Sequence, residues 1–202
     1  MPWIDVVSYE DSGGRLRQLY DRVTGPNGHV DNIMAVHSLR PHTMQSHMAL
    51  YKTVLHHSAN TAPTWFLETL GVWVSSLNGC SYCVEHHYAG LTRLVADQTR
   101  CRSLLQAIET RDVYSAPLEE KQKSAMRYAE VLTLTPSAVT ETLVQRMRET
   151  GWEDGEILEI NQVCAYFSYA NRTVLGLGCS TDGDVLGLSP ADTENEADWH
   201  HS

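Results

Sequence analysis

Apolar residues recur at helical spacing along almost the whole chain, and this pattern restricts the fold more than any other feature. Met44, Met48, Tyr51 and Leu55, for example, fall on one face of a helix. No run of residues alternates between apolar and polar with a period of two, and no Asn-Gly pair is flanked by such runs. The sequence therefore predicts an all-α fold.

Proline, glycine and capping residues divide this pattern into seven or eight helices. The predicted helices cover residues 14–23, 41–55, 63–77, 81–95, 97–109, 117–132, 137–150 and 155–175. Asp97, Ser137 and Asp154 are the predicted caps of the helices that follow them. Asn78 and Gly79 tolerate a left-handed backbone, so they predict a sharp turn between the third and fourth helices.

Length and composition favour one compact domain. With 202 residues, of which 42% are hydrophobic and 20% charged, the chain is long enough to bury a substantial core. We expect the helical domain to occupy residues 1–180 and an acidic, mobile tail to occupy residues 181–202. The tail contains six acidic residues and no lysine or arginine.

Charge and segment composition exclude several classes of protein. The formal net charge of −10 argues against nucleic acid as a partner, because phosphate binding needs a basic face. The most apolar segment, residues 157–177, is interrupted by charged and amide side chains, so no membrane-spanning helix is expected. The N-terminus has acids where a signal peptide has a basic patch and an apolar run. These features predict a cytoplasmic protein.

Four chemically active residues surround the predicted turn. Cys80 and Cys83 are separated by three positions and His87 lies four beyond Cys83, so all three project from one side of a helix. The start of that helix favours a thiolate, because its free amides and its dipole are positive there. If the two helices fold back on each other, Glu68 and His87 differ by roughly 3–5 Å along the axis, within reach of a side-chain bridge.

These residue types suit the reduction of a peroxide. Glu68 can orient His87, which takes a proton from the attacking thiol and returns it to the leaving oxygen. The second thiol then condenses with the sulfenic acid of the first, giving a disulfide that an external dithiol must reduce. The dipole argument alone activates Cys80, because it is nearer to the start of the helix.

The motif E-x11-C-S-Y-C-x3-H, residues 68–87, resembles the active-site motif of the alkyl hydroperoxidase D-like proteins in the carboxymuconolactone decarboxylase superfamily. The likeness is most evident for the branch of peroxidase-related enzymes. It covers roughly residues 30–180, because the segments DNIMAVHSLRPHTMQSHMALYKTVLH and GWEDGEILEINQVCAYFSYANRTVLGLG also resemble that branch. The resemblance implies an all-helical trimer or hexamer that reduces hydroperoxides without haem, flavin or metal.

Carried over position by position, the resemblance makes Cys83 the peroxidatic thiol and Cys80 the resolving thiol that faces the reductant. Glu68 and His87 become the proton relay. The position before the second cysteine is often histidine in this family and is Tyr82 here, so any relay role at that position moves to a phenol. The implied partners are a hydroperoxide, an external dithiol or thiol protein, and further copies of the chain.

Two other interpretations of the cluster stay open. In the first, the CxxC pair belongs to a non-catalytic redox sensor or oligomeric scaffold and only alternates between thiol and disulfide. In the second, Cys80, Cys83 and His87 bind zinc with a fourth ligand, since CxxC is half of many zinc centres.

The remaining histidines and cysteines are predicted to lie outside this chemistry. We expect surface or interface positions for the histidines His42, His47, His56 and His57, and an exposed position for His86. Cys101 and Cys164 lie in apolar helical patterns and are expected in the core, whereas Cys179 is a possible oxidation site. Five cysteines without an export signal argue against a structural disulfide framework.

Overall fold

The computed structural model describes residues 2–25 and 28–190, and all regular elements in these ranges are helices. The α-helices are α1 (Gly14–Val23), α2 (Asn32–Ala35), α3 (Pro41–Tyr51), α4 (Thr64–Leu77), α5 (Ser81–Leu94), α6 (Gln98–Glu109), α7 (Glu120–Leu134), α8 (Glu141–Glu149) and α9 (Asp154–Leu177). A π-helical turn, Lys52–His56, continues α3, and short 3-10 turns lie at Val113–Ser115 and Pro136–Ala138. The all-α prediction is confirmed. None of the described helices combines the length and the apolar character needed to cross a membrane.

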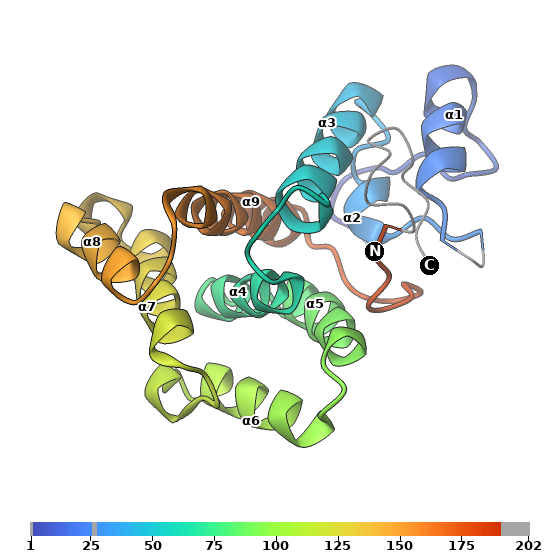
Figure 1. The fold of residues 1–202 in the computed structure, drawn as a ribbon. Coiled ribbons are helices and arrows are strands. Elements are labelled where there is room, and N and C mark those ends of the chain that lie inside the picture. The colour runs from blue at the N-terminus through green and yellow to red at the C-terminus, as the bar shows by residue number, and fades with distance from the viewer. Residues whose placement is uncertain (1, 26–27, 191–202) are drawn as a thin grey trace.

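Helix α4 lies at the centre of the molecule because it is apolar on nearly every side. Phe66, Leu70 and Trp73 are completely buried. Helix α4 packs against α5, α7 and α9 (Figure 1). Gly71 permits the close approach of α9, since a Cβ atom at this position would overlap the ring of Phe167. The centre of the core is therefore also the place where α4, α5 and α9 meet.

Most predicted helices begin and end within a few residues of the observed ones. The predicted helix 14–23 coincides with α1, and Asp97 caps α6 by accepting hydrogen bonds from two amides of its first turn at 2.9 and 3.1 Å. The prediction of Ser137 as a cap is wrong. Pro136 starts a separate 3-10 turn that contains Ser137, and α8 begins only after Thr140.

Three local features differ from the prediction. Asp154 is the first residue of α9 rather than its cap, and the preceding Glu153 takes the capping position, where its amide donates to Glu156 at 2.9 Å. Helix α2 has only four residues, and it lies between the first two predicted helices, where no helix was predicted. The π-helical turn keeps Tyr51 and Leu55 buried, as an α-helix would, so the apolar pattern does not distinguish the two.

The segment after α9 turns back along the body and passes α2 and the end of α5 (Figure 1). Arg93 of α5 donates hydrogen bonds to the carbonyls of Gly187 and Leu186 at 2.6 and 3.2 Å. Gly187 lies so close to the backbone of Ala89 that a Cβ atom would be 2.7 Å from its carbonyl carbon. The first ten residues of the predicted tail, 181–190, are thus packed against the helical body, and residues 191–202 lie outside the described residues.

Candidate functional site

The turn between α4 and α5 brings the motif residues together. Gly79 has a φ of +72°, the left-handed conformation expected of it, and Cys80 directly precedes α5. Nδ1 of His87 lies 2.8 Å from Oε2 of Glu68, so the contact that the spacing predicts is present. Because a carboxylate oxygen accepts, Nδ1 carries the hydrogen and Nε2 of His87 is the ring nitrogen left to exchange a proton.

The second oxygen of Glu68 faces a histidine that the sequence did not place at the site. Oε1 lies 3.6 Å from Nε2 of His56, and this nitrogen is 2.9 Å from the hydroxyl of Tyr51. Burial lowers the pKa of His56 to about 4, although Glu68 opposes the shift, so the imidazole is neutral at pH 7. The predicted surface or interface position of His56 is wrong, because the π-helical turn packs against α4 and α9.

Cys80 and Cys83 are free thiols, 0% and 2% exposed. The neighbouring Cys83 lowers the pKa of Cys80, while Cys80 and burial raise the pKa of Cys83 well above its usual value. These directions make Cys80 the better thiolate of the two. The buried amide of Asn171 on α9 lowers the pKa of each thiol, and its Nδ2 donates to Oγ of Ser75 at 3.0 Å.

A cavity of about 60 Å³ opens onto only one of the two thiols. Cys83, Glu68 and His87 line the cavity, and Cys80 does not. Leu188 also lines it, so the segment after α9 contributes to the wall. Since one water needs about 10–15 Å³ of such space, the cavity has room for a molecule of a few non-hydrogen atoms.

Tyr82 lines the same cavity, but its hydroxyl is directed to another set of partners. The hydroxyl donates to Oδ2 of Asp184 at 2.6 Å and accepts from the amide of Ile33 at 3.1 Å. Burial first, and Asp184 second, raise the pKa of Tyr82 well above its usual value of about 10, so the phenol stays protonated. These bonds link Tyr82 to α2 and to the segment after α9 rather than to Glu68 and His87.

Two further histidines are more buried than predicted. The side chain of His86 is only 13% exposed, because Asp184 covers it, with Nε2 of His86 at 3.3 Å from Oδ2. His47 is 3% exposed, and its Nε2 lies 3.2 Å from the hydroxyl of Tyr166. Burial, and to a lesser extent His37, lower the pKa of His47 to about 3. Both histidines line the cavity, and no spacing in the sequence signals this.

The other predicted positions agree with the structure. Cys101 and Cys164 are buried in the core, and Cys179 is half-buried. His42 is exposed and His57 is partly exposed.

The zinc interpretation of the CxxC pair finds no ligand set in the described part of the chain. Neither cysteine nor His87 belongs to a group of three ligand atoms lying within 4.8 Å of one another. The group that meets this criterion there is His29, Asp31 and Asp184, which lies beside the cavity.

Sequence comparison gives one distant relative. No family model matches the chain. A curated protein of Bacillus subtilis (strain 168), Uncharacterized protein YdfG, is 27% identical over 149 residues, which cover 72% of this chain and 93% of that protein.

Solved structures with the same fold span nearly the whole chain. An uncharacterized peroxidase-related protein from Ralstonia eutropha JMP134, described as an alkylhydroperoxidase AhpD core, has a TM-score of 0.76 at 20% identity, with 89% of this chain and 91% of that chain covered. A peroxidase-related protein from Silicibacter sp. TM1040 has a TM-score of 0.72 at 22% identity, covering 89% and 88%. The debrominase Bmp8 has a TM-score of 0.69 at 16% identity, covering 87% and 89%. These likenesses establish the fold.

Proposed function

We propose that this chain, which has the all-helical fold of the alkylhydroperoxidase D-like and peroxidase-related proteins, is a thiol peroxidase that reduces a small hydroperoxide. The observation that carries the proposal is that Cys83, His87 and Glu68 line one cavity, with His87 hydrogen-bonded to Glu68. A nucleophile, a base and a group that orients the base are the parts that nucleophilic catalysis needs. The names of the two peroxidase-related neighbours support the same class of reaction.

In the proposed first step, Cys83 transfers its thiol proton to Nε2 of His87 and attacks the terminal oxygen of the hydroperoxide. A sulfur–oxygen bond forms, the oxygen–oxygen bond breaks, and the leaving alkoxide takes the proton from His87 to become an alcohol. Glu68 keeps the hydrogen on Nδ1 and stabilises the imidazolium while it carries the additional proton.

In the second step, Cys80 attacks the sulfenic acid of Cys83. A disulfide bond forms, the sulfur–oxygen bond breaks, and the oxygen leaves as water after taking up one proton. The two thiols lose the two electrons that the hydroperoxide gains, and an external dithiol restores them by exchange. The lowered pKa of Cys80 suits this attack, because the thiolate is the reactive form.

In this proposal, the access of the substrate to each thiol determines which of the two attacks the peroxide. The pKa directions favour Cys80 as the thiolate, but only Cys83 lines the cavity that a substrate would enter. The cavity size favours hydrogen peroxide or a short alkyl hydroperoxide. A larger compound, such as the 2,3,4-tribromopyrrole held by a variant of the debrominase Bmp8, would require the cavity to widen.

The test is a comparison of Cys83→Ser and Cys80→Ser, with Cys101→Ser as a matched control at a buried cysteine outside the site. Peroxide consumption with excess dithiol should be abolished in Cys83→Ser and unchanged in Cys101→Ser. Without dithiol, Cys80→Ser should consume one equivalent of peroxide and then retain a sulfenic acid at Cys83, which mass spectrometry after dimedone treatment would locate.

Two results would sink the proposal. The first is peroxide turnover by Cys83→Ser at the wild-type rate. The second is a wild-type protein that forms the Cys80–Cys83 disulfide once and is not recycled by any dithiol, which would favour the redox-sensor interpretation.

A further inference from the structure

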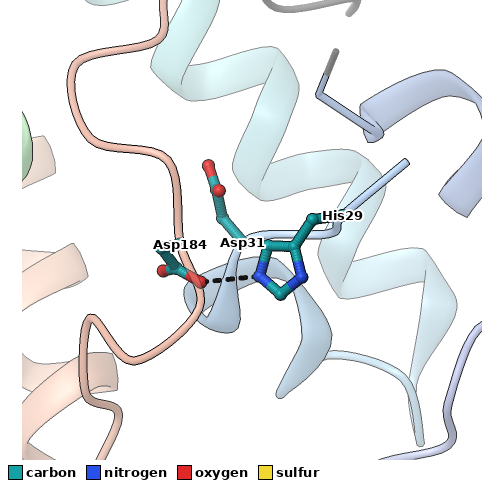
Figure 2. Close-up of side chains that lie close together, drawn as sticks. All are labelled: His29, Asp31 and Asp184. Atoms are coloured by element: carbon teal, nitrogen blue, oxygen red, sulfur yellow. Dashed lines mark hydrogen bonds and ion pairs between the residues drawn. The ribbon is translucent and has the colours of Figure 1, made fainter. Parts of the chain in front are cut away.

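Three potential metal ligands meet where the segment before α2 touches the segment after α9. His29 and Asp31 lie on the first segment and Asp184 on the second (Figure 2). One ligand atom from each lies within 4.8 Å of the others, and Nε2 of His29 is 2.9 Å from Oδ1 of Asp184. We refer to the contact between residues 28–32 and 180–190 as the junction.

The junction brings together two carboxylates without a cationic side chain to neutralise them. The side chain of Asp184 is completely buried, and Asp31 is half-buried. No lysine or arginine of the described residues donates a hydrogen bond to either carboxylate, and imidazoles are the nearest groups able to become positive. Burial, and then the charge of Asp184, raise the pKa of Asp31 to about 6.

The two carboxylates differ in how they are bonded. Asp184 accepts hydrogen bonds from Tyr82 and from the amide of Asn32, and His29 and His86 lie against it. The carboxylate of Asp31, in contrast, accepts no hydrogen bond from the described residues, although its carbonyl oxygen accepts from the amides of Met34 and Ala35 at 2.8 and 3.0 Å. A half-buried carboxylate that lies beside another carboxylate and has no protein donor is well suited to bind a cation.

We propose that His29, Asp31 and Asp184 bind one divalent transition-metal ion of the zinc type at the junction. One imidazole nitrogen with carboxylate oxygens is a ligand set for first-row transition metals, and the nitrogen disfavours magnesium and calcium. Two ligands that each lie about 2.0–2.2 Å from one ion are themselves about 3–3.5 Å apart, and the 2.9 Å between His29 and Asp184 lies near the lower end of this range.

Binding needs only a proton exchange and a small movement of Asp31. The ion takes the place of the hydrogen that Nε2 of His29 shares with Asp184, so a neutral imidazole carries its hydrogen on Nδ1 instead, and a charged one releases one proton to solvent. The hydrogen bonds from Tyr82 and Asn32 can remain, and His86 stays beside Oδ2 of Asp184, which orients the carboxylate.

An ion at the junction would affect the wall of the cavity that Cys83 lines. Asp31 and His86 line the cavity together with Cys83, and Leu188 from the segment after α9 lines it as well. An ion held by residues of both segments would fasten residues 180–190 to the body. The ion would stabilise the wall without being a reactant, so the inference stands apart from the peroxidase proposal.

Zinc also binds thiols, so the test starts from the full chain with Cys80→Ser and Cys83→Ser combined. Isothermal titration of this protein with zinc, after chelator treatment, should show one equivalent bound, and zinc should raise the melting temperature. Magnesium at the same concentration should do neither.

In the same background, Asp31→Asn and His29→Gln should each weaken zinc binding at least about tenfold and remove the zinc-induced rise in melting temperature. His42→Gln changes an exposed histidine elsewhere and should leave both unchanged. Without zinc, Asp31→Asn should melt no lower than its parent, because the carboxylate has no donor to lose and the repulsion from Asp184 disappears.

Three outcomes would overturn the proposal. They are no zinc binding by the Cys80→Ser/Cys83→Ser protein, zinc binding that is equally strong in Asp31→Asn and His29→Gln, and magnesium binding as strong as zinc binding. Because Asp31→Asn is expected to fold at least as well as its parent, loss of binding in that variant cannot be ascribed to unfolding.

Discussion

The α4–α5 hairpin and the junction both contribute to the cavity wall, but they are assembled over very different distances along the chain. In the hairpin, Glu68 and His87 are 19 residues apart, and one tight turn brings them into contact. In the junction, His29 and Asp184 are 155 residues apart, and they meet only when the body between them has folded. Local spacing therefore determines the first contact, whereas the path of the whole chain determines the second.

The largest expected effect separates the two regions by activity. His87→Gln removes the proposed base of the hairpin, and we expect the rate constant for peroxide reduction to fall by about 10²–10⁴-fold, the usual contribution of general acid–base catalysis. Stopped-flow measurement of thiol oxidation would give this rate directly.

The matched control is His86→Gln, one position earlier on the same helix. His86 lies against Asp184 at the junction, so its replacement should leave the rate within about threefold of wild type. Equal losses in the two variants would show that the proton path is not confined to the hairpin.

The sequence predicts the features of the fold and the site that depend on local contacts, and it misses those that depend on long-range contacts. The apolar periodicity predicts the positions of the helices and of the Asn78–Gly79 turn. The contact of Glu68 with His87 follows from their distances, in helical turns, from that turn. The burial of His56 and the packing of residues 181–190 do not, because each depends on elements far away in sequence. Asp184 illustrates this limit of prediction from sequence. It lies in an acidic stretch whose composition predicts a solvent-exposed tail, yet its side chain is completely buried.

Acid should destabilise the protein through the buried histidines beside the hairpin, most clearly His47. Burial lowers the pKa of folded His47 to about 3, whereas in the unfolded chain it has its ordinary value of about 6.5. Between these values the unfolded state binds a proton that the folded state does not. The stability present above pH 6.5 is therefore lost as the pH falls, by about 1.4 kcal/mol per pH unit, or about 3 kcal/mol at pH 4.5.

Urea unfolding of wild type and His47→Gln at pH 7 and pH 4.5 would measure this loss. The variant should be less stable at pH 7, because it disturbs the bond to Tyr166, but its stability should depend less on pH. His42→Gln, at an exposed position, should keep the wild-type pH dependence, and an unchanged dependence in His47→Gln would refute the assignment.

Asp184→Asn should loosen the junction while leaving the hairpin folded. The substitution removes the charge that accepts hydrogen bonds from Tyr82 and Asn32, and we expect the free energy of unfolding of the metal-free protein to fall by about 2–3 kcal/mol. Amide hydrogen exchange should accelerate in residues 181–190 and remain slow in α4 and α5.

Asp182→Asn is the matched control, since Asp182 lies in the same segment and its carboxylate accepts from the exposed hydroxyl of Ser180. Its effect on stability should stay within about 0.5 kcal/mol. Faster exchange in α4 and α5 of Asp184→Asn would mean that the two regions unfold as one unit.

The smallest effect is expected at Tyr82, which belongs to the hairpin by sequence and to the junction by its hydrogen bonds. Tyr82→Phe removes one donor from Asp184, whose other donors remain, so we expect a loss of about 1 kcal/mol in stability. The phenol is held protonated, with its pKa well above the usual value because of burial and Asp184, and it does not contact Glu68 or His87. The rate of peroxide reduction should therefore remain within about threefold of wild type. A fall comparable with that of His87→Gln would place the phenol in the proton relay and make the junction part of the catalytic apparatus.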